Sequence, residues 1–342
     1  MKKIIWFNHW FSTAYHFINQ VKQLNDVLVI GTNKRKECAY AEVCDEFYVE
    51  PDIVNYVDWC IDFCKEHNVS VFLPRKAQDE ISKHIDEFEN IGVKVIVERN
   101  SLVTSLGNKI LTNSLFKNLR LGYLAGEEIV KIPEIRVATN CEEFLDAYNE
   151  LKTMFPKERI CFKYAVDEGA TSFRVIDDAV DTIDSLRKGI GHKISLEKAL
   201  AMFKSVKTFD PVILMIFLNG TEISIDSLKT SKGFVGCARY KKGTRGSIID
   251  ANSKYIEISK RMAECLSLSC PYNLQIKMHD GHAYLLEVNT RMAGGTYKCS
   301  SAGINFAYLV VADALGLEFN LPEPTGKILV SHIEKPVVVK DY

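Results

Sequence analysis

Residues 281–295 read GHAYLLEVNTRMAGG and combine a turn, an apolar strand and a run of polar residues. Side chains of an extended strand alternate between its two faces, so Glu287, Asn289 and Arg291 are predicted to share one face. The apolar residues between them are predicted to face the other way. This stretch therefore places a carboxylate, an amide and a cation in a row at the end of one strand.

A carboxylate beside an amide carbonyl is a donor set typical of Mg²⁺ sites. Mg²⁺ prefers oxygen ligands, and it usually shares its coordination shell with water and nucleotide phosphates. Arg291 is well placed for an anion that meets such a metal. The alternative is a solvated strand edge followed by a turn at Gly294 and Gly295, and other segments must decide between the two.

A second strand is predicted immediately upstream. Residues 271–278 alternate apolar and polar side chains, and Asp280-Gly281 joins them to the first strand, which is a strong hairpin signal. In such a hairpin Gln275 would lie beside Glu287 and supply a third oxygen ligand.

The size and charge of the chain exclude several functional classes. With 342 residues, 47% hydrophobic and 25% charged, it is long enough for two or three domains with buried cores. The formal net charge of -1 gives no general attraction to nucleic acids or anionic membranes. The first apolar run is too short for a signal peptide, and no stretch approaches the ~18 apolar residues of a membrane span. We therefore expect a cytoplasmic protein with neither a nucleic-acid nor a membrane partner.

The cysteine pattern also indicates a reducing compartment. The ten cysteines show no C-x-x-C spacing and lie in apolar runs, as small reduced core residues do. Cys60 and Cys64 would share a helix face, which leaves a metal or redox site there as the alternative.

The first hundred residues alternate between strand and helix patterns, which favours a parallel sheet. The turn after the first strand reads NHWFST and lacks the G-x-G-x-x-G of dinucleotide-binding folds, so a nicotinamide oxidoreductase is disfavoured. His9, Ser12, Lys34 and Arg35 are candidates to line a cleft for a small substrate, with surface or core roles as the alternative. The predicted strands are 3–7, 27–30, 69–73 and 93–97, and the predicted helices are 15–24, 52–67 and 77–90.

The middle of the chain contains a candidate phosphate-binding loop. Residues 101–121 are predicted to form a helix with Lys109 near its middle, and 159–176 form two apolar strands around a loop of small and hydroxylated residues. Such a loop directs backbone N–H groups and hydroxyls at phosphate oxygens, with Lys163 and Arg174 supplying charge. The alternative is a plain exposed hairpin.

An apolar strand, 211–218, then ends at Asn219-Gly220-Thr221-Glu222. A buried strand that surfaces at a turn offers backbone groups to an adenine edge, and Glu222 is placed for ribose hydroxyls. The alternative is a core strand followed by a hairpin. Further on, Arg239 and Arg245 in a basic segment suggest an anionic acceptor near Arg291, or a solvated turn.

In this order the segments resemble the ATP-grasp superfamily, in the group similar to the large subunit of carbamoyl phosphate synthase. The resemblance covers nearly the whole chain and is most specific over residues 109–295. It implies an α/β and α+β fold, in which an N-terminal pre-ATP-grasp parallel-sheet domain precedes a two-subdomain ATP-grasp fold. The expected ranges are 1–100 for the first domain, 101–212 for the N-terminal subdomain with the phosphate lid and 213–342 for the C-terminal subdomain with the metal site.

The resemblance also implies roles for individual residues. Mg²⁺, with Mn²⁺ as a substitute, would be bound by Gln275, Glu287 and Asn289, and Arg291 would hold the acyl phosphate or the carboxylate before it reacts. The implied ATP contacts are Lys109 and Lys163 on the phosphates, a mobile lid of Glu168, Gly169, Ala170, Thr171 and Ser172, the backbones of Ile216 and Leu218 at adenine and Glu222 at ribose.

The activity implied is that of an ATP-dependent carboxylate–amine ligase forming C–N bonds, acting on small-molecule carboxylate and amine substrates. Lys163 and Arg291 would then serve catalysis, with Arg239, Arg245, Gly294 and Gly295 toward the substrate. The alternative is a non-catalytic, ATP-binding regulatory protein that keeps the fold. A homodimer is left open.

Overall fold

The computed structural model describes residues 2–180, 183, 187, 191–333 and 336–339. The chain forms two compact units, each built from segments that are separate in the sequence. The three domains expected from the sequence are each continuous in the chain, and those domain boundaries stay a prediction. Unit 1 comprises Met1–Leu106, Thr221–Gln275 and Val288–Tyr342, and unit 2 comprises Gly107–Gly220 and Ile276–Glu287.

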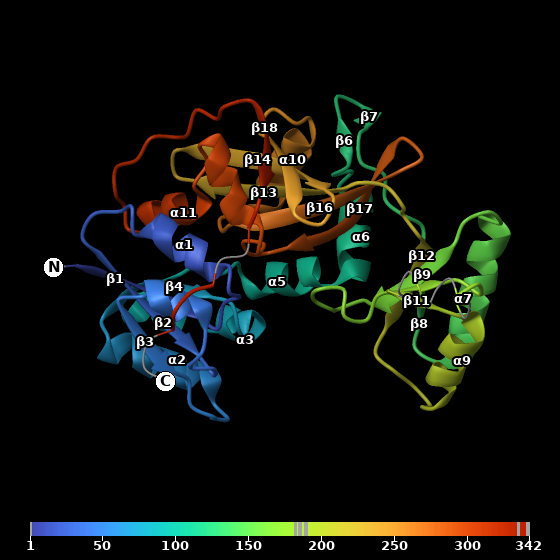
Figure 1. Ribbon diagram of the computed structural model, residues 1–342, viewed down its shortest axis with the longest axis horizontal. Coiled ribbons are helices and arrows are strands. Elements are labelled where there is room, and N and C mark those ends of the chain that lie inside the picture. The colour runs from blue at the N-terminus through green and yellow to red at the C-terminus, as the bar shows by residue number, and fades with distance from the viewer. Residues whose placement is uncertain (1, 181–182, 184–186, 188–190, 334–335, 340–342) are drawn as a thin grey trace. The chain divides into compact units, whose positions relative to one another are not determined.

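Unit 1 opens with a five-stranded parallel sheet, which confirms the expected fold of the N-terminal region (Figure 1). The order of its strands changes direction between β1 and β4, as in doubly wound α/β folds. The strands in spatial order are β3 (Glu46–Val49), β2 (Val27–Asn33), β1 (Lys3–Asn8), β4 (Val69–Pro74) and β5 (Lys94–Val95). The intervening helices are α1 (Ala14–Val21), the 3-10 helix η1 (Ala39–Val43), α2 (Tyr56–Glu66), α3 (Gln78–Lys83) and α4 (Ile85–Asn90).

Both faces of this sheet are buried, because alternate residues of β1 enter different cores. Ile5 and Phe7 belong to one cluster, and Trp6 belongs to the other, where its ring stacks on Phe72 at 4.0 Å. Residues 77–90 are predicted to form one helix, but they form two. His84 leaves helical geometry and separates α3 from α4.

The second sheet has six strands, and α10 (Tyr255–Leu266), η2 (Thr296–Ala302) and α11 (Phe306–Ala314) follow or interrupt them in the chain. Within unit 1, β13, β14, β15 and β18 pair antiparallel. The hairpin predicted between the strand 271–278 and the strand that follows it is present as β16 and β17. The strands in order are β17 (His282–Asn289), β16 (Tyr272–His279), β13 (Glu222–Thr230), β14 (Gly233–Lys242), β15 (Gly246–Asp250) and β18 (Lys327–Ser331).

Unit 2 contains a five-stranded sheet covered by α7 (Cys141–Met154) and α9 (Leu196–Lys204) (Figure 1). Phe144 of α7 and Phe203 of α9 pack on Phe162 of the central strand and form its core. The strands in order are β11 (Lys193–Ile194), β10 (Arg174–Ile176), β9 (Ile160–Tyr164), β12 (Val212–Ile216) and β8 (Ile135–Ala138). A small hairpin pairs β6 (Tyr123–Leu124) with β7 (Glu127–Glu128).

The predicted helix over 101–121 is two helices, α5 (Asn100–Gly107) and α6 (Lys109–Asn118). Asn108 separates them because its backbone is extended and its side-chain oxygen accepts the N–H groups of Ile110 and Leu111. Lys109 is therefore the first residue of α6 and not the middle of a longer helix.

All ten cysteines are free thiols. No helix among the described residues has the length and apolar character needed to cross a membrane.

Candidate functional site

Lys109 is fixed at the start of α6. Its backbone N–H, which has no partner within the helix at this position, donates to the Ala165 carbonyl at 3.0 Å. Its side chain is 5% exposed, and the ammonium donates to the Asp167 carbonyl at 3.1 Å. The helix end thus joins the loop that follows β9.

Two lysine ammonium groups converge on one carboxylate within unit 2. The Oε2 atom of Glu287, on β17, lies 3.4 Å from Nζ of Lys163, on β9, and 3.8 Å from Nζ of Lys109. Burial, together with the neighbouring charge of Lys163, lowers the pKa of Lys109. Two cations around one anion leave an excess of positive charge, which suits a ligand with several phosphate oxygens.

The predicted phosphate loop is ordered by a residue that the sequence analysis did not single out. Asp167 accepts a hydrogen bond from the Ser172 backbone at 2.9 Å and a second from the Ser172 hydroxyl, while that hydroxyl accepts the Tyr164 N–H at 3.0 Å. Burial alone would raise the pKa of the Asp167 carboxyl, but these bonds and the charge of Lys109 hold it below its usual value. The Asp-x-x-x-x-Ser spacing at a loop start was the available signal.

The tip of this loop has left-handed backbone geometry. Gly169 has φ 66° and Ala170 has φ 59°, and Thr171 closes the turn by donating its hydroxyl to the Glu168 carbonyl at 3.0 Å. Ser172 and Thr171 are therefore engaged inside the loop, and a ligand would have to compete for their hydroxyls.

Replacing Asp167 with asparagine should loosen this loop. The amide keeps the shape but loses the charge that accepts two hydrogen bonds, and each charge-assisted bond contributes about 1.5–3 kcal/mol. We expect faster amide hydrogen exchange over 167–172 and unchanged exchange in α7. Asp146→Asn, on that helix, is the matched control, and equal protection of the loop in Asp167→Asn and wild type would contradict this assignment.

The segment expected to meet adenine lies at the end of β12. Ile216 is 7% exposed and Leu218 2%, and the Phe217 N–H between them donates to the Arg159 carbonyl at 2.7 Å. The Phe217 ring has the Arg159 guanidinium 4.8 Å from its centroid and the Lys277 ammonium at 5.5 Å. Glu222 begins β13 and is half-buried.

Three further predicted residues, Gln275, Asn289 and Arg291, belong to unit 1. Gln275 donates its amide N–H to Asn273 Oδ1 at 3.0 Å, which leaves its carbonyl oxygen as an acceptor. Asn289 follows Glu287 by two residues in β17, as the alternation requires. Val288, between them on the strand, is buried, whereas Glu287 and Asn289 are half-buried.

Arg291 lies near the carboxyl end of the parallel sheet. Its guanidinium is 5.7 Å from the centroid of the Phe11 ring, and that of Arg75, which follows β4, is 4.3 Å from the same ring. The carboxyl edge of such a sheet, at the point where strand order reverses, is where open α/β folds bind ligands. Of the other candidates there, His9 lies 3.7 Å from the buried Glu50, and burial lowers its pKa, while Lys34 pairs with Asp52 at the surface.

Arg239 is engaged in a buried ion pair. It donates through Nε to Asp226 Oδ2, and Asp226 Oδ1 accepts from Asn273 at 2.9 Å and from the Thr296 hydroxyl at 2.6 Å. The Asp226 side chain is 1% exposed. Burial alone would lower the pKa of Arg239, but Asp226 raises it above its ordinary value. This pair holds the Arg239 guanidinium within unit 1, and its role toward the substrate stays a prediction. Arg245 is exposed in the turn between β14 and β15.

Gly294 and Gly295, which follow Arg291 in the chain, differ in the space available for a side chain. A Cβ on Gly295 would lie 2.4 Å from Nη1 of Arg239, whereas a Cβ on Gly294 would meet Thr13 Oγ1 at an ordinary 3.5 Å. We expect Gly295→Ala to lower the free energy of unfolding by about 1–3 kcal/mol through overpacking. Gly294→Ala, its neighbour and control, should change it by less than about 0.5 kcal/mol. Urea denaturation measures both, and equal effects would contradict the packing described for Arg239.

The residues present fit a magnesium–nucleotide complex. Glu287 and Asn289 offer carboxylate and amide oxygens, which Mg²⁺ prefers, and the lysines at 3.4 and 3.8 Å from Glu287 would meet phosphate charge. Lys109 also lies at the first turn of α6, where the partial positive charge of a helix end favours anions.

Comparisons with known proteins agree with this fold. Residues 208–336 match a family model described as ATP-grasp in the biosynthetic pathway with Ter operon. A search of curated protein sequences found no significant match. Among solved structures, N5-carboxyaminoimidazole ribonucleotide synthetase (purK) in complex with ADP has a TM-score of 0.69 at 14% identity, over 96% of this chain and 80% of that chain.

Two further solved structures show the same fold. The biotin carboxylase domain of Hydrogenobacter thermophilus 2-oxoglutarate carboxylase, in complex with MgADP, ADP and bicarbonate, has a TM-score of 0.66 at 14% identity, over 96% of this chain and 73% of that chain. N5-carboxyaminoimidazole synthetase from Staphylococcus aureus, complexed with ADP, has a TM-score of 0.69 at 9% identity, over 97% of this chain and 83% of that chain. The chain thus matches an ATP-grasp family model over residues 208–336, and it shares its fold with these three solved structures.

Proposed function

We propose that this protein is a Mg²⁺-dependent ligase that uses ATP to activate a carboxylate as an acyl phosphate and then joins it to an amine. The observation that carries the proposal is the convergence of Lys109 and Lys163 on Glu287. The ADP and MgADP complexes among the solved neighbours support a nucleotide as the ligand.

The residues of unit 2 would bind the triphosphate. Lys163 and the first turn of α6 with Lys109 would hold phosphate oxygens, and the loop from Glu168 to Ser172 would close over them. The backbone at Ile216 and Leu218 would meet adenine, and Glu222 would accept hydrogen bonds from ribose. The lysine–glutamate contacts hold the ammonium groups in place before the nucleotide arrives.

Mg²⁺ would be bound by Gln275, Glu287 and Asn289. When bound, it would neutralise part of the negative charge of the phosphates. A carboxylate is a poor electrophile, so the γ-phosphoryl group is first transferred to it from ATP, with release of ADP. Arg291 would hold the carboxylate and then the acyl phosphate. The amine next attacks the acyl carbon, loses a proton, and phosphate leaves with the C–O bonding pair.

No nucleophilic side chain is needed for this sequence of steps. Positioning and electrostatic stabilisation supply most of the acceleration of phosphoryl transfer, and the lysines and Arg291 provide the fixed positive charges. A closed lid would exclude the water that otherwise hydrolyses the acyl phosphate.

The test is a screen for ADP formation with Mg-ATP and pools of carboxylates and amines, run on wild type and Glu287→Ala. If the protein is this ligase, wild type releases ADP only when a pool contains its carboxylate substrate, and Glu287→Ala releases none. Tight ATP binding with no substrate-stimulated ADP release in any pool would instead indicate the alternative, an ATP-binding regulatory protein.

A further inference from the structure

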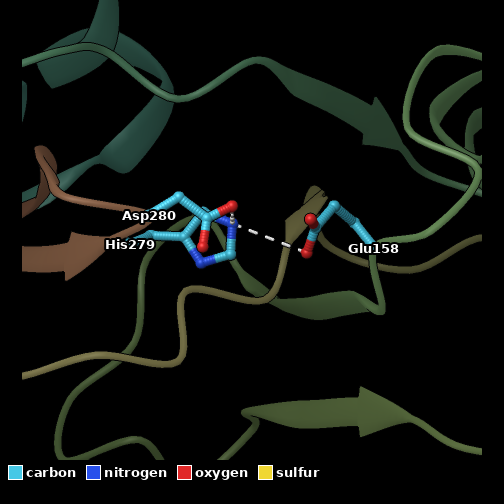
Figure 2. Close-up of side chains that lie close together, drawn as sticks. All are labelled: Glu158, His279 and Asp280. Carbon is cyan, nitrogen blue, oxygen red and sulfur yellow. Dashed lines mark ion pairs between the residues drawn. The ribbon is translucent and has the colours of Figure 1, made fainter.

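A second group of possible metal ligands lies in unit 2, apart from Lys163 and Lys109. Glu158, His279 and Asp280 each present one donor atom, and the three atoms lie within 4.8 Å of one another (Figure 2). Glu158 precedes β9, His279 ends β16, and Asp280 begins the turn to β17. Two segments distant in the sequence therefore bring the three donors to one point.

The imidazole of His279 is held in one orientation. Its side chain is 5% exposed, and its Nδ1 atom lies 3.2 Å from Asn219 Oδ1. An amide oxygen only accepts, so Nδ1 carries the hydrogen and, in the neutral ring, Nε2 carries the lone pair. A hydrogen bond from the other ring nitrogen to an oxygen atom fixes the tautomer of a metal-binding histidine.

The lone pair of His279 faces two carboxylates. Its Nε2 atom is 3.5 Å from Glu158 Oε2 and 3.7 Å from Asp280 Oδ2, as the dashed lines in Figure 2 mark. No lysine or arginine of the described residues is ion-paired with either carboxylate. Three acceptor atoms that point at one another repel unless a cation lies between them, either a proton on the ring or a metal ion.

The spacing matches small metal ions with nitrogen and oxygen ligands. Donors at about 2.0–2.1 Å from a tetrahedral Zn²⁺ are separated by about 3.4 Å. The two separations from His279 Nε2 are close to that value. An imidazole ligand favours Zn²⁺, Co²⁺ and similar ions over Mg²⁺ and Ca²⁺.

We propose that Glu158, His279 and Asp280 bind a divalent transition metal ion of the Zn²⁺ type, with Asn219 as the residue that orients the imidazole. Two carboxylates balance the charge of the ion, and the exposed side of Asp280 leaves a fourth position for water. The bound ion would link the segment before β9 to the β16–β17 turn. This inference does not depend on the proposed ligase activity.

The experiment titrates Co²⁺ into the full-length protein with its thiols reduced, followed by visible absorption and by competition with Zn²⁺. We expect one equivalent to bind with the d–d bands of a tetrahedral nitrogen–oxygen site and without the sulfur-to-metal charge-transfer band that a cysteine ligand gives. Asp280→Asn, at an exposed position, should weaken binding at least tenfold, and Asn219→Ala about 10–100-fold.

His282→Gln is the matched control, because this exposed histidine lies on the same hairpin outside the cluster. It should bind Co²⁺ as tightly as wild type does. The proposal is overturned if wild type binds no Co²⁺, if the spectrum shows a thiolate ligand, or if Asp280→Asn and Asn219→Ala bind as wild type does. In those cases the cluster is an ion pair of a protonated histidine.

Discussion

Glu287→Gln should abolish substrate-stimulated ADP release, with a fall in kcat of at least about 100-fold. The substitution keeps the side-chain shape but removes the charge on which Lys163 and Lys109 converge at 3.4 and 3.8 Å. It also removes the carboxylate proposed to hold Mg²⁺. Rates of ADP formation at saturating Mg-ATP, compared with wild type, measure the effect.

Glu127→Gln provides the control for this variant. Glu127 is an exposed carboxylate in unit 2, on β7, and its loss should leave ADP release unchanged. A Glu287→Gln protein that retains more than a tenth of the wild-type kcat would show that this carboxylate does not take part in catalysis.

Asp226→Ala should give the largest loss of stability in unit 1, about 3–5 kcal/mol. The variant leaves the buried Arg239 guanidinium without its counter-charge and removes the acceptor of Asn273 and Thr296. Chemical denaturation followed by tryptophan fluorescence measures it, since Trp6 and Trp10 lie in the cores of the same unit.

Two further variants test whether the loss of stability comes from the unpaired buried charge or from the loss of any ion pair. The double variant Asp226→Ala/Arg239→Met removes both charges and should recover part of the loss, because an unpaired buried charge is the main cost. Asp52→Ala breaks the exposed pair with Lys34 and should change the free energy of unfolding far less than Asp226→Ala does. Equal losses in Asp226→Ala and Asp52→Ala would contradict a buried ion pair.

The features that sequence predicted well are those set by local pattern. The parallel sheet follows from short apolar strands that alternate with helices, and the β16–β17 hairpin follows from Asp280-Gly281 between two alternating strands. Lys163 is indicated by its place beside a loop of small and hydroxylated residues, and Glu287 by its place among alternating polar residues at a strand end. Within unit 2, Nζ of Lys163 lies 3.4 Å from Oε2 of Glu287.

The features that sequence missed depend on contacts between distant segments. Nothing near Asp226 in the sequence indicates that Arg239 will be its ion-pair partner. The break at Asn108 depends on capping hydrogen bonds that form only once the chain leaves helical geometry, and Gly107-Asn108 is the local signal for it. His279 and Glu158 meet through packing across 121 positions of the chain.

The central claim is that Glu287, beside Lys109 and Lys163, belongs to a site for ATP with Mg²⁺. The most direct measurement is equilibrium binding of ATP to wild type and Glu287→Gln, each with Mg²⁺ and with a chelator. We predict that Mg²⁺ tightens ATP binding to wild type at least tenfold and leaves the affinity of the variant unchanged. An ATP affinity that does not respond to Mg²⁺ in wild type, or that responds equally in both proteins, would contradict the account.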